Sequence, residues 1–73
     1  MKLHKIGHIV SFKLGAKELN APDRAWIRFI ERLKREIPPD DRIYHDENKS
    51  WAVDEKYEQK LKVLVNYYFK ENE

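Results

Sequence analysis

A strand is predicted over residues 9–14 from the alternation of apolar and polar side chains. Val10, Phe12 and Leu14 fall on one face of an extended chain, and the residues between them fall on the other. A period of two residues is typical of a strand with one buried face. Residues 15–20 lack such a period and are expected to form a connecting loop.

The next segment has helical spacing and predicts a helix that ends near Glu36. We place its start at Ala21-Pro22-Asp23, because proline is tolerated in a first helical turn and an aspartate there faces the positive end of the helix dipole. Pro38-Pro39 ends the helix, since proline lacks an amide donor and disfavours helical geometry in the residue before it. The apolar stripe expected to face the core consists of Trp26, Ile30, Leu33 and Ile37, with Ile27 and Phe29 on its flanks.

Residues 42–53 predict a β-hairpin closed by the polar turn 46–49. A turn of this length places Tyr44 directly opposite Trp51, as an aromatic cross-strand pair. Within the turn, Asn48 is the residue expected in the left-handed conformation, which asparagine adopts more readily than most residues.

A last helix is expected after Asp54, whose side chain can cap the free amide groups of a first turn. One side of this helix is apolar at helical spacing and is formed by Tyr57, Leu61, Leu64, Val65 and Tyr68. Three further apolar residues fall outside that stripe, namely Val63, Tyr67 and Phe69. Residues 70–73 are expected to fray, as chain ends do.

These elements predict a single small α+β domain over residues 1–73, in the order β-α-β-β-α. We expect a three-stranded sheet with two helices packed on one face. The other face of the sheet is then open to solvent and carries Ile9, Ser11, Lys13, Ile43, His45, Ser50 and Ala52.

Composition limits the classes of protein to consider. The chain has no cysteine, and its 15 basic and 13 acidic residues leave a net charge of +2, which is too small to require a polyanionic partner. No apolar run approaches the roughly 20 residues needed to span a bilayer, and the first residues do not resemble a signal peptide. We therefore expect a cytoplasmic protein that does not bind membranes.

Four arginines give the clearest functional signal. Arg24, Arg28, Arg32 and Arg35 recur at spacings that place them along one side of the predicted helix, nearly opposite its apolar stripe. Guanidinium groups stay charged at physiological pH and match the geometry of phosphate oxygens. The row therefore predicts a module that binds DNA or RNA through its phosphates.

Two more cations, Arg42 and Lys49, are expected to assist this contact. The alternative is that the row is only the charged outer face of an amphipathic helix. In that case Glu31 and Glu36 are available to pair with the arginines.

A second functional hypothesis is a protein-interaction or homodimerisation module. Its contact surface would be the apolar strip Val63, Tyr67 and Phe69 on the last helix, or else the open face of the sheet. The partner would be another protein or a second copy of the chain.

An enzyme is not expected. The chain has no glycine-rich phosphate loop, no activated serine and no metal-ligand spacing, so we predict neither cofactor nor metal. The histidines His4, His8 and His45 are expected at the surface, and the acidic pairs Asp40-Asp41 and Asp46-Glu47 are expected to serve local turns.

One stretch of the chain, from roughly Phe29 to Leu64, resembles the HARP domain of annealing helicases and related helicase-associated modules. The resemblance consists of Ile37-Pro38, then Arg42, Tyr44, Lys49 and Trp51, then Tyr57 and Leu61 opening a helix. It implies a role in binding structured DNA. The chain departs from that family at His45, where aspartate is usual, and at Asp40-Asp41, where basic residues are common.

Overall fold

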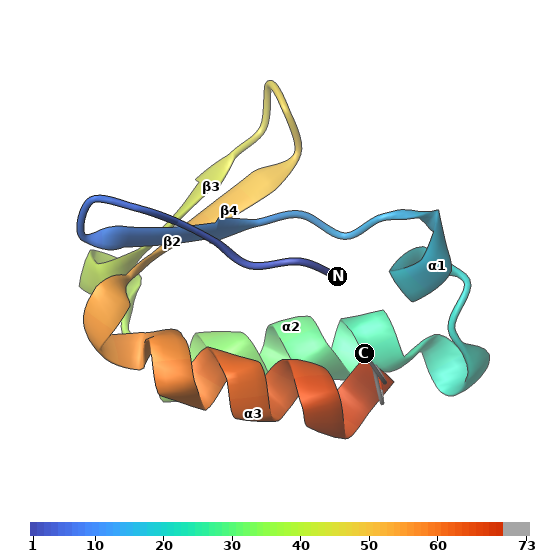
Figure 1. Cartoon of the computed structure of the whole chain (residues 1–73). Helices are drawn as coiled ribbons and strands as arrows, with labels where there is room; N and C mark the ends of the chain where they lie inside the picture. The colour runs from blue at the N-terminus through green and yellow to red at the C-terminus, as the bar shows by residue number, and fades with distance from the viewer. Residues whose placement is uncertain (70–73) are drawn as a thin grey trace.

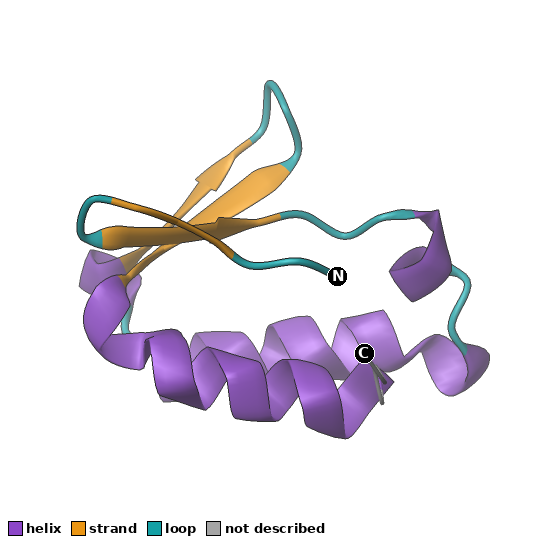
Figure 2. Ribbon diagram, in the orientation of Figure 1, coloured by secondary structure: helices purple, strands orange, loops and turns teal. Residues whose placement is uncertain are grey.

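A four-stranded antiparallel sheet forms one layer of the structure, and two helices packed side by side form the other (Figure 1). This computed structural model describes residues 1–69. The strands are β1 (His4–Ile6), β2 (Ile9–Phe12), β3 (Arg42–His45) and β4 (Ser50–Asp54), in the spatial order β1-β2-β4-β3. The helices are α1 (Ala16–Leu19), α2 (Ala25–Glu36) and α3 (Glu58–Phe69), with 3-10 turns at Pro22–Arg24, Pro39–Asp41 and Glu55–Tyr57 (Figure 2).

The α+β class is confirmed, but the count of three strands and two helices is wrong. The additional strand, β1, pairs with β2 through a tight turn at Gly7, whose φ of 61° suits a residue without a side chain. All three residues of β1 are exposed, so the strand has no buried alternation that a sequence pattern could reveal.

The loop expected over residues 15–20 contains the short helix α1. Its single turn is closed by Glu18, whose carboxylate accepts a hydrogen bond from the Gly15 amide at 2.9 Å. The same buried carboxylate lies 2.7 Å from the amino group of Met1. Local polar contacts, and not the burial of an apolar face, therefore hold this segment in its helical turn.

The start of α2 differs from the expectation. Asp23 and Arg24 have positive φ values of 61° and 52°, so the turn that contains Pro22 is separate from the helix, which begins at Ala25. Its predicted end is confirmed, because Glu36 is the last helical residue and Pro38 follows at once. The Ile37 amide still donates a hydrogen bond to the Leu33 carbonyl oxygen, at 2.9 Å.

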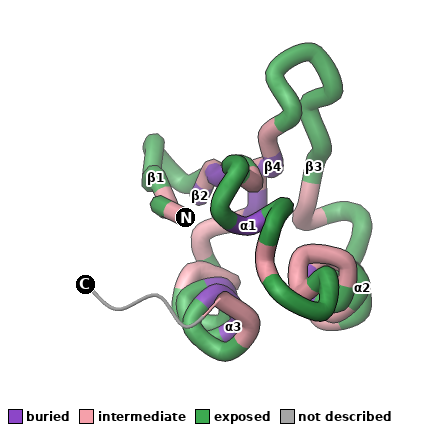
Figure 3. The backbone as a smooth tube through the Cα atoms, turned by 90° about the vertical axis from the view of Figure 1, so that its right-hand side faces the viewer, coloured by how far each residue is buried: buried purple, intermediate pink, exposed green. Residues whose placement is uncertain are grey.

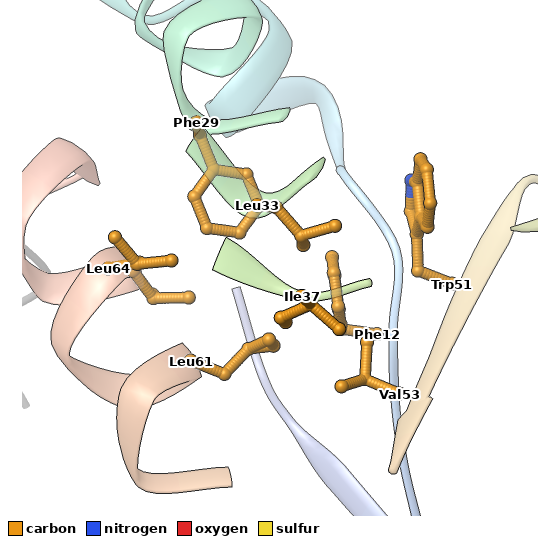
Figure 4. Close-up of a cluster of buried hydrophobic side chains, with 9 residues drawn as sticks. Phe12, Phe29, Leu33, Ile37, Trp51, Val53, Leu61 and Leu64 are labelled. Atoms are coloured by element: carbon orange, nitrogen blue, oxygen red, sulfur yellow. The ribbon is translucent and has the colours of Figure 1, made fainter. Parts of the chain in front are cut away.

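The core lies between the sheet and the two long helices (Figure 3). Phe29 is at its centre and not on a flank, because its ring packs against Phe12 at 5.9 Å and Phe69 at 5.3 Å between centroids. Trp26, placed in the predicted stripe, is only half-buried. The fully enclosed side chains come from both layers and are Val10, Phe12, Phe29, Leu33, Ile37, Val53 and Leu61, most of them visible in Figure 4.

The hairpin of β3 and β4 has the predicted register, with Tyr44 opposite Trp51. Their rings lie 5.0 Å apart between centroids. The left-handed residue of the turn is Lys49, with a φ of 56°, and not Asn48 as expected. Asn48 instead accepts a hydrogen bond from the Ser50 hydroxyl at 2.6 Å.

One face of the sheet is open, as predicted. The register of the strands places Ile6, Ile9 and Ile43 on this face, and all three are exposed. The half-buried Ala52 lies on the same face in β4, the strand between β2 and β3. The opposite face carries the buried side chains of β2 and β4. Lys13, which was also assigned to the open face, follows the end of β2.

The last helix follows the prediction in outline. The Asp54 side chain accepts a hydrogen bond from the Lys56 amide at 2.9 Å, but a 3-10 turn comes first and α3 begins at Glu58. Of the predicted stripe, Leu61, Leu64 and Val65 are buried, whereas the two tyrosines are half-buried. Residues 70–73, where fraying was expected, lie outside the described part of the chain.

Candidate nucleic-acid interface

The outer face of α2, away from the sheet, carries the arginines that the structure leaves available. Arg28 and Arg35 project from the helix, and Arg24 directly precedes it. All three are exposed, and within residues 1–69 none has a carboxylate oxygen within 4.0 Å. These groups therefore have the free charge that the sequence hypothesis requires.

Arg32 is different, because it belongs to an ion-pair cluster between the two long helices. Its Nε lies 2.8 Å from Glu36 Oε2, and Lys60 Nζ of α3 lies 3.0 Å from Glu36 Oε1. The hydrogen bond from Arg32 and the contact with Lys60 lower the pKa of the Glu36 carboxyl. Arg32 keeps 42% of its side-chain surface exposed, but Glu36 engages its Nε, which sets it apart from Arg24, Arg28 and Arg35. Its contact with phosphate stays a prediction.

The two assisting cations also have contacts within the protein. Arg42 is half-buried and its Nε donates a hydrogen bond to the Ile37 carbonyl oxygen at 2.8 Å. Lys49 lies in the hairpin turn, with its Nζ 3.3 Å from Asp46 Oδ1. The structure thus does not bring all six predicted cations into one row.

Sequence reasoning missed one cation near this surface. Lys34 lies one residue before Arg35 and its Nζ is 6.0 Å from the centre of the Trp51 ring. It is exposed on the side of α2 that faces the hairpin. The periodicity joins residues three or four apart, and Lys34 is not at such a spacing from the neighbouring arginines on the predicted face.

Outside the outer face of α2, several lysines are paired with carboxylates. Lys5 lies 3.1 Å from Glu55, Lys56 lies 3.5 Å from Asp41, and Lys62 lies 3.6 Å from Glu58. Carboxylates around α3 and β1 are therefore paired with lysines. The outer face of α2 keeps more positive than negative charge, with Glu31 as an exposed acidic residue within it.

The predicted apolar strip on α3 is smaller than expected. Val63 and Tyr67 are exposed, but Phe69 is half-buried against Phe29. The Tyr67 ring contacts Tyr68 edge to face, at 4.9 Å between centroids. Two residues alone do not make a continuous apolar surface.

The three histidines lie in different places: His4 in β1, His8 in the turn between β1 and β2, and His45 at the end of β3, directly before Asp46-Glu47. His8 Nδ1 is 2.6 Å from Glu55 Oε2, and this hydrogen bond is the largest cause of a lowered pKa for Glu55. His4 and His45 are exposed. Across the described residues, no group of three or more histidine, aspartate or glutamate side chains could hold a metal ion.

Comparisons with protein-family models, with curated proteins and with solved structures found no match to this chain. Within residues 1–69, none of the helices has the length and apolar character needed to cross a membrane.

Proposed function

We propose that this chain is a non-enzymatic nucleic-acid-binding module whose contact surface is the outer face of α2. The observation that supports this proposal is the set of three exposed arginines, Arg24, Arg28 and Arg35, without carboxylate partners in the described residues. Guanidinium groups bind phosphate oxygens in pairs of parallel hydrogen bonds, and these three arginines have no side-chain hydrogen bond within residues 1–69 that competes with such a contact.

The spacing of the arginines suits an extended phosphate backbone. Arg28 and Arg35 are two helical turns apart, which corresponds to about 10 Å along the axis. A rigid helix therefore holds them at a separation that two or three successive phosphates can span. Because no base-reading groups accompany them on this face, affinity is electrostatic and independent of sequence.

Salt dependence gives the first test. Neutralising about three phosphates makes the affinity fall roughly 20- to 40-fold between 50 and 200 mM salt. Fluorescence anisotropy of labelled oligonucleotides measures this directly. Absence of binding at low salt, or binding that salt does not weaken, contradicts the proposal.

Substitutions locate the surface. The double variant Arg28→Gln, Arg35→Gln removes two charges from α2 and is expected to weaken binding to every sequence. A matched control, Gln59→Glu with Lys62→Gln, changes the net charge equally at exposed positions of α3. If the control loses as much affinity as the arginine variant, net charge alone explains binding and the α2 surface is not the site.

A second candidate function is self-association through the open face of the sheet. The exposed isoleucines Ile6, Ile9 and Ile43 favour it, because three large apolar side chains on one face are costly in water. Four short strands offer a flat footprint of only about 300 Å² per copy, against roughly 800 Å² in a standard interface. Any such dimer is therefore weak and forms only at high protein concentration.

Sedimentation velocity over a wide concentration range tests this candidate. We expect the average mass to rise at high concentration and the variant Ile43→Lys to stay monomeric. A wild-type chain that is monomeric throughout excludes self-association.

A further inference from the structure

The β3–β4 hairpin rises away from the helical layer (Figure 1). A cleft lies between this hairpin and α2. Its volume is about 440 Å³, within the roughly 300–1,000 Å³ of small-molecule sites. Apart from Lys49, the lining is apolar or aromatic and consists of Leu14, Leu19, Trp26, Ile30, Tyr44 and Trp51.

The aromatic residues of the cleft present a flat surface to an incoming group. Trp51 is buried, with 8% of its surface exposed, and supports Tyr44, which is 45% exposed. Their rings are tilted by 50° with centroids 5.0 Å apart. The register of the hairpin places Tyr44 opposite Trp51, and the contact between the two rings supports the exposed Tyr44 ring from one side.

Positive charge borders this aromatic surface from both sides. Lys34 Nζ lies 6.0 Å from the centre of the Trp51 ring, and Lys49, whose Nζ is also 3.3 Å from Asp46 Oδ1, contributes to the lining from the hairpin. Lys34 and Arg35 lie on the same turn of α2, about 100° apart around the helix axis, so the border of the cleft and the arginine face are neighbouring sides of one helix. A flat apolar ligand that carries negative charge complements this arrangement.

We propose that the cleft receives an unpaired base of a single-stranded nucleic acid, stacked on the ring of Tyr44, with the adjoining phosphates near Lys34 and Lys49. This inference rests on the proposed function and makes it more specific. Bases in a duplex are already stacked on their neighbours, whereas single strands expose them to aromatic side chains. The preferred ligand is therefore a single strand.

An apolar side chain from an acidic protein segment is the competing occupant. The charge at the cleft favours a base, because Lys34 and Lys49 stand beside the aromatic rings, where the phosphates on either side of a stacked base would lie. An aliphatic side chain needs only the apolar lining and does not account for the exposed ring of Tyr44.

Intrinsic fluorescence reports on the cleft directly, because the chain has two tryptophans and both line it. Titration with oligothymidylate is expected to quench this fluorescence, whereas a duplex of equal length is expected to leave it nearly unchanged. A strand of the same length with abasic sites keeps the phosphates but lacks bases. It is expected to bind more weakly and without quenching.

The variant Tyr44→Leu tests the stacking ring while keeping an apolar residue opposite Trp51. Loss of one stacked base raises the dissociation constant for the single strand about 5- to 150-fold. Tyr67→Leu is the matched control, because Tyr67 is 68% exposed on α3 and does not line the cleft. Circular dichroism confirms that both variants fold, and Lys34→Gln provides a second variant if Tyr44→Leu does not.

Each outcome separates the two proposals. If single strands, duplexes and abasic strands bind equally without quenching, the cleft proposal is wrong and the arginine face stands. If no nucleic acid binds at low salt, both proposals are wrong. If only an acidic amphipathic peptide binds and changes the fluorescence, the cleft belongs to a protein partner.

Discussion

Arg42 connects the first strand of the hairpin to the end of α2. Its Nε donates a hydrogen bond of 2.8 Å to the carbonyl oxygen of Ile37, the residue that follows the last helical residue. This carbonyl has no partner within the helix, and a cation near this end also faces the negative end of the helix dipole. Arg42 therefore stabilises the fold across the turn at Pro38, and this contact leaves its Nε unavailable to phosphate.

Replacing this arginine tests that assignment. Arg42→Ala is expected to lower the free energy of unfolding by about 1.5–3 kcal/mol, the usual contribution of a hydrogen bond to a charged group. Urea denaturation followed by circular dichroism measures the loss. Arg35→Ala, at an exposed position without such a bond, is expected to change stability by less than about 0.5 kcal/mol. Equal effects of the two substitutions would contradict a structural role for Arg42.

Phe29 is the side chain on which both layers of the core depend. It contacts Phe12 of the sheet and Phe69 of α3. Phe29→Ala is expected to cost about 3–5 kcal/mol, a large part of the roughly 4–11 kcal/mol expected for a domain of this size. Thermal and urea unfolding should show a broadened or missing transition. Tyr67→Ala at the surface is the control and is expected to unfold like the wild type.

Arg24 offers a way to separate binding from stability. Its φ of 52° and ψ of 49° are left-handed, a conformation that costs an L-residue about 1–2 kcal/mol. Glycine removes this strain but loses about 0.5–1 kcal/mol in chain entropy. Arg24→Gly is therefore expected to raise the free energy of unfolding by up to about 1 kcal/mol. Loss of one phosphate contact should also reduce the steepness of log affinity against log salt concentration by about 1.

The same substitution inside the helix provides the control. Arg28→Gly replaces a residue in regular helical geometry and is expected to destabilise by about 1 kcal/mol. Urea midpoints of the two variants should therefore move in opposite directions. A fall in stability for Arg24→Gly refutes the left-handed geometry of that residue.

The pH dependence of stability follows from the cluster that joins α2 to α3. Hydrogen bonding by Arg32 and then by Lys60 lowers the pKa of Glu36 below its ordinary value of 4.5. A carboxyl whose pKa is lower in the folded state contributes stability above the unfolded pKa and loses it as pH falls through the folded pKa. The contribution is therefore complete at neutral pH and is lost below about pH 4.5.

Glu36→Gln removes this dependence. We expect the variant to be less stable than the wild type at neutral pH and to approach it in acid. Denaturant unfolding between about pH 7 and pH 3 measures the difference. Glu31→Gln, on the exposed side of α2 and outside the cluster, is the control and should keep the wild-type profile. A constant difference between Glu36→Gln and the wild type at all pH values contradicts the assignment.

Periodicity was sufficient to predict the elements that bury one face. The end of α2, the register of Tyr44 with Trp51 and the buried residues of α3 all follow from apolar spacing and proline chemistry. Periodicity could not reveal β1, because its residues are all exposed and it forms a strand only by pairing with β2. Nor could it reveal α1, which depends on the contacts of a single carboxylate at Glu18.

The candidate site was predictable only in part, for a similar reason. Helical spacing identified Arg28 and Arg35 correctly as exposed. It offered Glu36 as a partner for the arginines, but it could not show that Lys60 of α3 also contacts Glu36, because α3 approaches α2 only in the folded chain. The cleft brings together Trp26 of α2, Tyr44 of β3 and Trp51 of β4, three elements that no short sequence motif spans.

The central pairing of the sheet has a consequence for synthesis of the chain. β2 lies between β1 and β4, and its buried residues Val10 and Phe12 stand opposite Val53 and Trp51. After β1 and β2 have left the ribosome, Val10 has Lys5 beside it, but the partners of Val10 and Phe12 in β4 are 43 residues (53 minus 10) and 39 residues (51 minus 12) further along the chain. The sheet therefore cannot close until β4 has been made, and a chain interrupted before that point exposes the unpaired edge of β2, which can pair with other chains.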